Sequence, residues 1–248
     1  MTDGLLLLHG WPLDGSMWDP QIVGLEDVAI IAPSMPGFGG TPVTAAVMTM
    51  DAAADAAADA VRNAGLDGAV VCGLSMGGYV ALALWRRHRE LFRGLILANT
   101  KSGPDDDAGR ERRRALAERL RSEGNGFLAQ SPSPLLSSDA PQELWDMVKA
   151  SIRFQPAEAI AAAALGMAER PDSTSDLAGI DVPSLVITSS NDTLIPPEAT
   201  SPIASDIPGA RLEIIPNAGH LSNLEAPDAF NDLLRSHLAA CGVAGRTT

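Results

Sequence analysis

Ser75 stands out as a candidate nucleophile because glycines flank it in a short motif between two apolar runs. Residues 73–79 read GLSMGGY, after the run DGAVVC and at the start of the stretch YVALALW. A GxSxG motif between a strand and a helix suits a nucleophile elbow, whose sharp turn lifts the serine hydroxyl above the sheet edge. The helix N-terminus would direct free N–H groups toward a developing oxyanion. The motif alone also fits a small residue in a tight turn, so its partners decide between the two interpretations.

A serine hydroxyl needs a general base, and the chain offers four histidines. His220, in PNAGHLSNLE, follows the last apolar run and precedes a helical segment, so its loop can place the imidazole over the sheet edge. We therefore favour His220. His88 and His237 are interpreted as surface residues or residues at helix ends, whereas His9 stays open as an alternative base.

The base needs an acid to orient it, and Asp192 is the favoured candidate. It lies a few residues after a buried run in SLVITSSNDTLIPPE, where its carboxylate could accept the Nδ1 proton of His220. Asp192 also fits an ordinary Asx turn. Asp105, Asp106 and Asp107 are rivals, although three adjacent acids are more typical of a solvated loop.

Two backbone N–H groups are expected to form an oxyanion hole. One belongs to Met76, directly after Ser75, and the other to Trp11 in the loop HGWPLDG. Gly10 permits that turn, and His9 is expected to tie the loop together through a hydrogen bond.

Six short apolar runs bounded by Gly, Pro, Asp or Asn predict the strands that must position these residues. Runs apolar throughout are typical of strands covered on both faces, as in a parallel sheet. The runs are Leu5–Leu8, Val28–Ala32, Ala69–Leu74, Leu95–Asn99, Ser184–Thr188 and Arg211–Ile215.

Helical segments alternate with these strands, which predicts a doubly wound α/β sheet. Helices are expected over Met50–Ala64, with Asp51 near its start and Gly65 beyond its end, over Met76–His88 and over Ser222–Ala240. Residues 100–176 break the alternation with charged and alanine-rich helical sequence around a loop, PSPLLSSDAP. We expect residues 1–99 and 177–248 to form the core and residues 100–176 to form a helical cap, or else a set of solvated helices without a catalytic role.

Composition excludes several classes of partner. Among 248 residues, 31 acidic side chains outnumber 18 basic ones, giving a formal charge of -13. Such a field repels phosphate backbones and anionic headgroups, so nucleic acid and membrane surfaces are not expected as partners. The N-terminus lacks a basic region before its four leucines, which favours a cytoplasmic location. No metal-ligand cluster is evident from spacing, so no metal is expected.

Five motifs in order resemble the α/β-hydrolase superfamily: HGW at 9–11, PGFGGT at 36–41, GLSMGG at 73–78, SNDTLIPP at 190–197 and NAGH at 217–220. The chain is most similar to small bacterial esterases and lactonases of the 3-oxoadipate enol-lactonase and pimeloyl methyl ester esterase kind. The resemblance implies a triad of Ser75, Asp192 and His220, a helical cap, and hydrolysis through an acyl-enzyme without a cofactor. Members usually carry a β-hairpin before the strand that ends in HG. Here only residues 1–4 precede that strand, so we expect about six strands and a possible homodimer.

The leading hypothesis is a carboxylic ester hydrolase acting on a small ester or lactone. The same triad also serves carbon–carbon bond hydrolysis and perhydrolysis, and a non-catalytic ligand-binding member of the fold is a further alternative. A haloalkane dehalogenase is disfavoured because its nucleophile is an aspartate. Residues expected to contact substrate are Trp18, Phe38, Phe127, Trp145, Ile195 and Leu221, with Met35, Leu135, Leu136, Met147 and Met167 as further candidates, although each also fits the core.

Overall fold

A computed structural model describes residues 3–243, and its strands form one parallel six-stranded sheet in the order β2-β1-β3-β4-β5-β6. The strands are β1 (Asp3–Leu8), β2 (Ile30–Ile31), β3 (Gly68–Leu74), β4 (Phe92–Ala98), β5 (Ser184–Ser189) and β6 (Arg211–Ile215). The predicted fold class and the number of strands are confirmed. The edge strand β2 is shorter than predicted, and dimerisation stays a prediction.

The central strands are buried along nearly their whole length, as their apolar runs require. All seven residues of β3 are buried, and the apolar side chains of β1, β4 and β5 join the same hydrophobic core. The outer strand β6 is exposed at four of five positions to some degree, which fits its place at the edge of the sheet. The burial of each strand therefore matches its position, with the most buried strands in the centre of the sheet.

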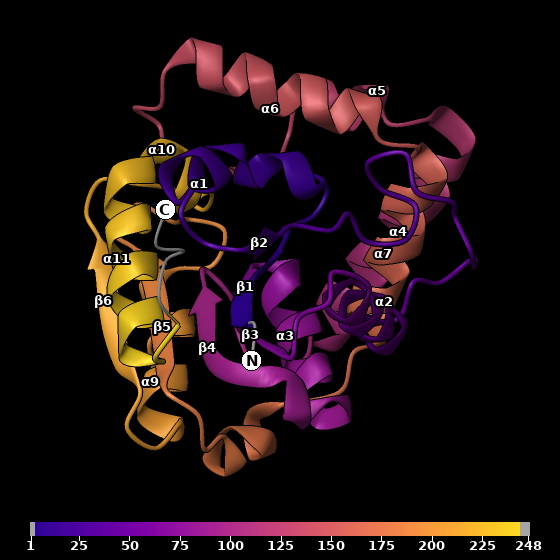
Figure 1. Cartoon of the computed structure of the whole chain (residues 1–248). Helices are drawn as coiled ribbons and strands as arrows, with labels where there is room; N and C mark the ends of the chain where they lie inside the picture. Colours follow the sequence, from indigo (N-terminus) through magenta and orange to yellow (C-terminus); the bar gives the residue numbers. More distant parts are fainter. Residues whose placement is uncertain (1–2, 244–248) are drawn as a thin grey trace.

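Helices cover both faces of this sheet. On one side, α2 (Met50–Asn63) packs against α3 (Met76–Arg87), which contacts β1, β3 and β4; on the other, α1 (Asp19–Gly24) packs against α11 (Pro227–Ala240) (Figure 1). The side chain of Thr49 caps α2 by accepting from the N–H of Ala52, and Gly65 adopts φ +71° beyond its end. The cap of α2 is therefore Thr49, two residues before the expected Asp51.

The prediction of one continuous helix over Ser222–Ala240 is wrong, because two helices form there. Short α10 (Ser222–Glu225) ends before Ala226, whose φ of -133° is not helical, and α11 begins at Pro227. Proline suits the first position of a helix and disfavours helical backbone in the residue before it. The break follows from Pro227.

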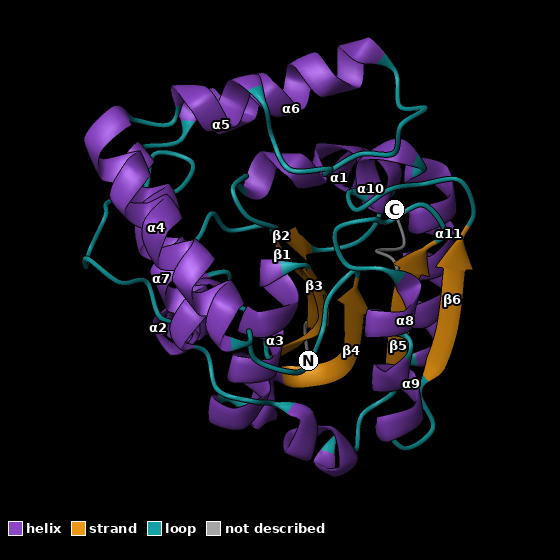
Figure 2. Cartoon of the chain, turned by 180° about the vertical axis from the view of Figure 1, so that it is seen from behind, coloured by secondary structure: helices purple, strands orange, loops and turns teal. Residues whose placement is uncertain are grey.

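Residues 100–176 form helices and no strand. They are α4 (Asp107–Glu123), α5 (Gly126–Gln130), α6 (Gln142–Phe154) and α7 (Ala157–Glu169), with the 3₁₀-helix η3 (Thr174–Gly179) at their end. Helix α4 packs along α7, while α5 and α6 run across one end of the molecule (Figure 2). These helices stand beside the edge of the sheet at which the strands end.

The remaining short helices connect the strands. They are α8 (Pro197–Thr200), α9 (Pro202–Asp206), η1 (Gly15–Trp18) and η2 (Arg89–Leu91). Across residues 3–243, none of the helices is both long and apolar enough to cross a membrane.

The sheet order reverses at β1, which has β2 on one side and β3 on the other. Open parallel sheets place ligand sites outside the carboxyl ends of their strands at such a switch point. Ser75 directly follows β3 at this point, so the topology favours the edge where that residue lies.

Candidate active site

Ser75 occupies a strained turn between β3 and α3. Its φ of 57° and ψ of -116° lie outside the regions that non-glycine residues commonly adopt. The surrounding backbone holds this turn: the N–H of Ser75 donates to Ala98 O at 3.0 Å, and its carbonyl accepts from Gly78 N at 2.9 Å and from Thr100 Oγ1 at 2.8 Å. The backbone of Ser75 is thereby held at the end of the sheet.

Close backbone approach explains the glycines of the motif. A Cβ at Gly73 would collide with the carbonyl of Gly77, and a Cβ at Gly77 would collide with the carbonyl of Leu8 in β1. Both obstacles are backbone atoms that cannot rotate away. The GxSxG pattern therefore lets α3 start directly against the sheet.

His220 and Asp192 form a buried pair in the loops after β6 and β5. The Nδ1 atom of His220 lies 2.8 Å from Oδ2 of Asp192, and the two side chains are 1% and 0% exposed. Nε2 of His220 is buried and has no hydrogen-bond partner among residues 3–243. The ring therefore has one nitrogen engaged by a carboxylate and one nitrogen free to exchange a proton.

The carboxylate of Asp192 is held from both sides. Its Oδ1 accepts hydrogen bonds from the N–H groups of Leu194 and Ile195 at 2.9 and 2.8 Å, while its Oδ2 faces His220. The Asx turn and the contact with His220, which the sequence left as alternatives, thus coexist on one residue.

Asn99 completes a hydrogen-bond network that sequence reasoning missed. At the end of β4, its Nδ2 donates to Asp192 Oδ2 at 2.9 Å and to Ser189 Oγ at 2.7 Å, and its Oδ1 accepts from Ser222 Oγ at 2.7 Å. Asn99 has a φ of 46° and is fully buried. A buried asparagine directly after a predicted strand was the available signal.

The other three histidines have different environments. His9 Nε2 accepts from Met35 N at 2.9 Å, which ties the loop after β1 as expected, and burial lowers the pKa of His9 to about 4. His88 contacts Asp55 and Arg62 near the surface. His237 is buried within α11, and burial lowers its pKa to about 4.

The rival acids are also placed elsewhere. Asp105 is bound by Arg113 and Arg170, Asp106 caps α4 through the N–H of Gly109, and the side chain of Asp107 is almost fully exposed. None of the three is bonded to His220.

The two expected oxyanion-hole residues lie near Ser75 in different elements. Met76 is the first residue of α3, so its N–H has no carbonyl of a preceding helical turn to bond. Trp11 lines the same cavity as Ser75, and its Nε1 donates to Ile160 O in α7 at 3.1 Å. This bond joins the loop after β1 to the helices of residues 100–176.

A cavity of about 390 Å³ lies over Ser75. Of the six residues expected to contact substrate, Ile195 lies on its wall, and of the further candidates Leu135 and Met167 do so. The full lining is Trp11, Ser75, Tyr79, Lys101, Asp105, Gly109, Arg112, Arg113, Leu116, Ser133, Leu135, Met167, Leu194, Ile195, Pro196 and Ala199.

Five expected substrate contacts lie away from this wall. Trp18, Phe38 and Leu221 are fully buried in the core, where Trp18 packs on Phe230 and Phe38 packs on His9. Phe127 and Trp145 pack partly buried against the core. A sequence does not reveal whether an apolar side chain of a loop or short helix faces a cavity or the core. Substrate contact by these five residues stays a prediction, while the structure places them outside the lining of this cavity.

Two kinds of lining residue were missed. Tyr79 lies four residues after Ser75, so the helical period of α3 places it on the same face as the start of the helix, and this spacing could have revealed it. Lys101 lies in the loop after β4, at the sheet edge that carries the site. Arg112 and Arg113 lie in sequence typical of a solvated helix, and only the packing of α4 brings these two residues to the cavity.

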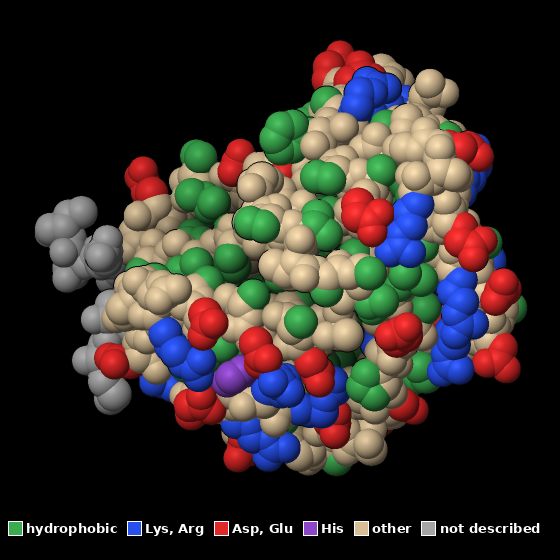
Figure 3. Space-filling model, turned by 90° about the vertical axis from the view of Figure 1, so that its right-hand side faces the viewer, with side chains coloured by type: hydrophobic (Ala, Val, Ile, Leu, Met, Phe, Trp, Pro, Cys, Tyr) green, Lys and Arg blue, Asp and Glu red, His purple; other side chains and the backbone are tan. Residues whose placement is uncertain are grey.

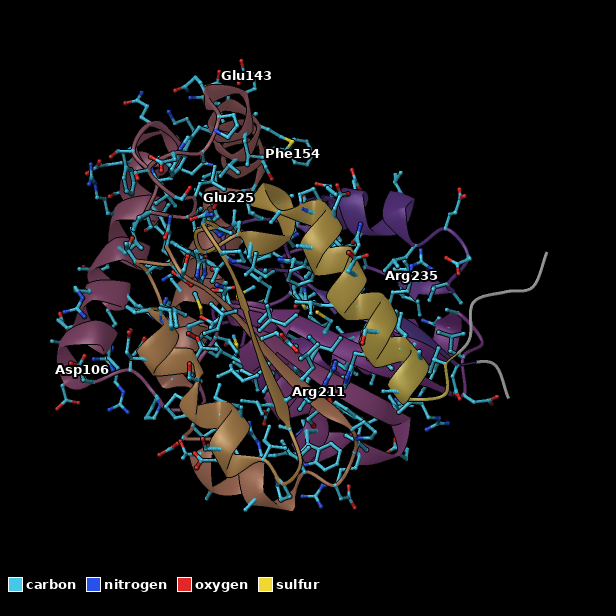
Figure 4. The ribbon with its side chains drawn as sticks, turned by 90° about the vertical axis from the view of Figure 1, so that its left-hand side faces the viewer. Asp106, Glu143, Phe154, Arg211, Glu225 and Arg235 are labelled. Atoms are coloured by element: carbon cyan, nitrogen blue, oxygen red, sulfur yellow. The ribbon has the colours of Figure 1, made fainter. Side chains whose placement is uncertain are left out.

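Glu225 links the loop of His220 to the helices of residues 100–176. Its carboxylate accepts from Gly219 N at 2.8 Å, from Ser137 N at 3.0 Å and from Ser137 Oγ at 2.6 Å. The N–H of Leu221 donates to Leu135 O at 2.8 Å. Figure 4 shows Glu225 between the sheet and the overlying helix that carries Phe154.

The described residues hold no cluster of three or more His, Cys, Asp or Glu side chains able to bind a metal ion.

Comparison with known proteins finds a match over nearly the whole chain. The model of the alpha/beta hydrolase family matches residues 5–233. A pimeloyl-[acyl-carrier protein] methyl ester esterase of Aromatoleum aromaticum is 30% identical, covering 90% of this chain and 93% of that protein. The 3-oxoadipate enol-lactonase 2 of Acinetobacter baylyi is 27% identical, covering 87% of this chain and 81% of that protein.

One solved structure has a higher sequence identity to this chain than these two relatives. The thermophilic esterase from Thermogutta terrifontis, solved with malate bound, superposes with a TM-score of 0.93 at 40% identity and covers 97% of this chain and 90% of that one. The resemblance therefore extends from the core through residues 100–176.

Proposed function

The chain belongs to the alpha/beta hydrolase family and is an esterase-like hydrolase, and we propose that it cleaves a small carboxylic ester or lactone through an acyl-enzyme on Ser75. One observation carries this proposal. The buried pair of His220 and Asp192, 2.8 Å apart, leaves Nε2 of His220 unpartnered at the sheet edge where Ser75 lies in its strained turn.

In the acylation step, Ser75 Oγ attacks the substrate carbonyl while Nε2 of His220 takes the hydroxyl proton. Asp192 keeps Nδ1 of the imidazole as the donor and stabilises the imidazolium that forms. The N–H groups of Trp11 and Met76 donate to the oxyanion of the tetrahedral intermediate. Collapse of that intermediate breaks the ester bond, and His220 returns the proton to the departing alcohol oxygen.

In the deacylation step, water replaces the alcohol. His220 removes a proton from water as its oxygen attacks the acyl carbonyl, and the proton then goes to Ser75 Oγ as the acid leaves. For a lactone, the departing alcohol stays tethered to the acyl group, so the same residues open the ring.

We propose residues 100–176 as a cap that forms the acyl pocket. Gly109, Arg112, Arg113 and Leu116 of α4 and Met167 of α7 line the cavity over Ser75. A covering wall excludes water and strengthens electrostatic interactions at the reacting carbonyl. The hydrogen bond from Trp11 to Ile160 supports a fixed position for this cap.

Replacing Ser75 by alanine tests the proposed function. Turnover of 4-nitrophenyl butyrate should fall by a factor on the order of 10⁵ to 10⁶, since the nucleophile is lost while the pocket remains. Ser122→Ala is the matched control, because Ser122 is exposed on α4 outside the lining of the cavity and its loss should leave turnover nearly unchanged. Undiminished turnover by Ser75→Ala would refute the proposal.

A further inference from the structure

The charged residues around the cavity over Ser75 are mostly cations. Four of the lining residues are charged, and three of them are basic: Lys101, Arg112 and Arg113 stand against Asp105. The chain as a whole carries a charge of -13, and acidic and basic side chains alternate over the face formed by α2, α4 and α7 (Figure 3). The cavity therefore has the opposite sign to the molecule that surrounds it.

Asp105 neutralises only part of this positive charge. Its Oδ1 lies 3.1 Å from Lys101 Nζ and 2.9 Å from Arg170 Nη2, and its Oδ2 accepts a hydrogen bond from Arg113 Nε. Burial alone would raise the pKa of Asp105, but hydrogen bonds from Arg170 and Arg113 hold it well below its usual value. Three cations around a single carboxylate leave two positive charges in excess.

Arg170 has a structural role within this group. Its side chain is 3% exposed, donates to Met167 O, Gly103 O and Asp105, and lies over the ring of Tyr79 with Cζ 4.1 Å from the ring centroid. With these donors engaged, Arg170 holds Asp105 in place.

Arg113 and Lys101 retain donors for a ligand. Arg113 is bonded through Nε, and its two terminal nitrogens have no hydrogen-bond partner within the part of the chain that the structure describes. Lys101 likewise has Asp105 as its one ion-pair partner among residues 3–243. The paired terminal nitrogens of a guanidinium match the two oxygens of a carboxylate.

The rest of the wall suits a short hydrocarbon chain. Trp11, Leu116, Leu135, Met167 and Ile195 contribute apolar surface to the same cavity as Ser75 and the cations. A ligand of this cavity would therefore combine an ester carbonyl, a few methylene groups and an anionic end.

We propose that the preferred substrate carries a carboxylate at the far end of its acyl part and that Arg113 and Lys101 bind this carboxylate. This substrate class rests on the proposed role of Ser75 as the nucleophile. Binding the anion orients the acyl chain so that its carbonyl faces Ser75. The carboxylate of Asp105 orients the side chains of Lys101 and Arg113.

Matched pairs of esters test this assignment. Methyl hydrogen glutarate and methyl pentanoate differ by a carboxylate in place of a terminal methyl group, and 4-acetoxybutanoate and butyl acetate differ in the same way on the alcohol side. We expect the wild-type protein to favour methyl hydrogen glutarate over methyl pentanoate in kcat/KM by about tenfold or more, with methanol release as the readout.

Charge-removing variants locate the site. Arg113→Gln should lower the ratio of the two kcat/KM values about threefold, mainly through KM for the charged ester, and the double variant with Lys101→Gln should remove the remaining preference. Lys101→Gln alone leaves the ion pairs of Asp105 with Arg113 and Arg170 intact, so this variant should fold normally. Its lower ratio would then report the loss of the Lys101 charge and not the loss of the fold. Arg114→Gln is the matched control, since Arg114 neighbours Arg113 and is exposed beside Glu111.

Two results would overturn the assignment while leaving the proposed function intact. One is an unchanged ratio in both Arg113→Gln and Lys101→Gln. The other is a larger preference within the acetate pair, which would place the anion on the alcohol part. Failure of the proposed function differs from both, because Ser75→Ala would then still hydrolyse methyl pentanoate.

Discussion

The Nδ2 atom of Asn99 lies 2.9 Å from Oδ2 of Asp192, the same carboxylate oxygen that lies 2.8 Å from Nδ1 of His220. One amide group from the end of β4 thus helps to orient the pair formed by the loops after β5 and β6. Because Ser222 Oγ donates to the other end of this amide, its orientation is fixed by hydrogen bonding.

Asn99→Ala should lower kcat about 10- to 100-fold, because Asp192 loses a donor and can rotate away from His220. A positioning role predicts that the pH profile of kcat/KM changes as well. Asn217→Ala is the control for backbone strain, since Asn217 also has a positive φ, 61°, but is exposed and lies outside the network. Equal effects of the two variants would contradict a specific role for Asn99.

Glu225→Ala should lower both kcat and the melting temperature. The change removes the acceptor shared by Gly219 N and two groups of Ser137, and buried N–H groups left without partners cost about 1 to 3 kcal/mol each. Thermal unfolding and steady-state kinetics measure the two effects. Glu143→Ala, on α6, is the control, and an unaltered kcat in Glu225→Ala would show that this link does not position His220.

Gly77→Ala should abolish activity or unfold the protein, because the new Cβ would meet the carbonyl of Leu8 in the central strand β1. Gly103→Ala is the matched control, since a Cβ there has open space. Activity and the urea midpoint distinguish the two variants. A fully active Gly77→Ala protein would show that the contact between α3 and β1 is looser than described.

Stability should fall as the pH drops from about 6.5 to about 4. Burial lowers the pKa of His9 and of His237 from 6.5 to about 4, so the unfolded chain binds more protons in this range and the free energy of unfolding rises with pH. Each of these two histidines should contribute about 3 kcal/mol to the free energy of unfolding. This contribution is fully present above about pH 6.5 and is lost near pH 4.

Urea unfolding across this pH range measures the slope. His237→Gln, which cannot titrate, should reduce the slope by about half, and the wild-type protein is its reference. A slope identical in both proteins would refute the assignment of this pH dependence to His237.

The sequence predicted the parts of the site that depend on local pattern. Apolar runs marked the strands, and the GxSxG motif, the acid after β5 and the histidine after β6 each lie where a strand ends. The strand ends of a parallel sheet share one edge, so chain order sufficed to bring Asp192 and His220 together.

The remainder depends on how distant segments approach one another. Arg113 belongs to a helix rich in charged residues, and its place in the cavity follows only from the packing of α4 on α7. Trp18, at the end of η1, and Phe38, in a loop, are apolar, and a sequence does not reveal whether such a residue faces a pocket or the core. Glu225 acquires its partners only when the loop of Ser137 folds over the sheet.

Mass analysis of the trapped intermediate tests the acyl-enzyme most directly. Rapid acid quench during turnover of 4-nitrophenyl butyrate, followed by peptide mapping, should find one butyryl group on Ser75 in the wild-type protein and none in Ser75→Ala. His220→Ala is expected to show little acylation, because the serine proton then has no acceptor. A butyryl group on Ser133, or equal labelling of wild type and Ser75→Ala, would contradict the assignment of Ser75 as the nucleophile.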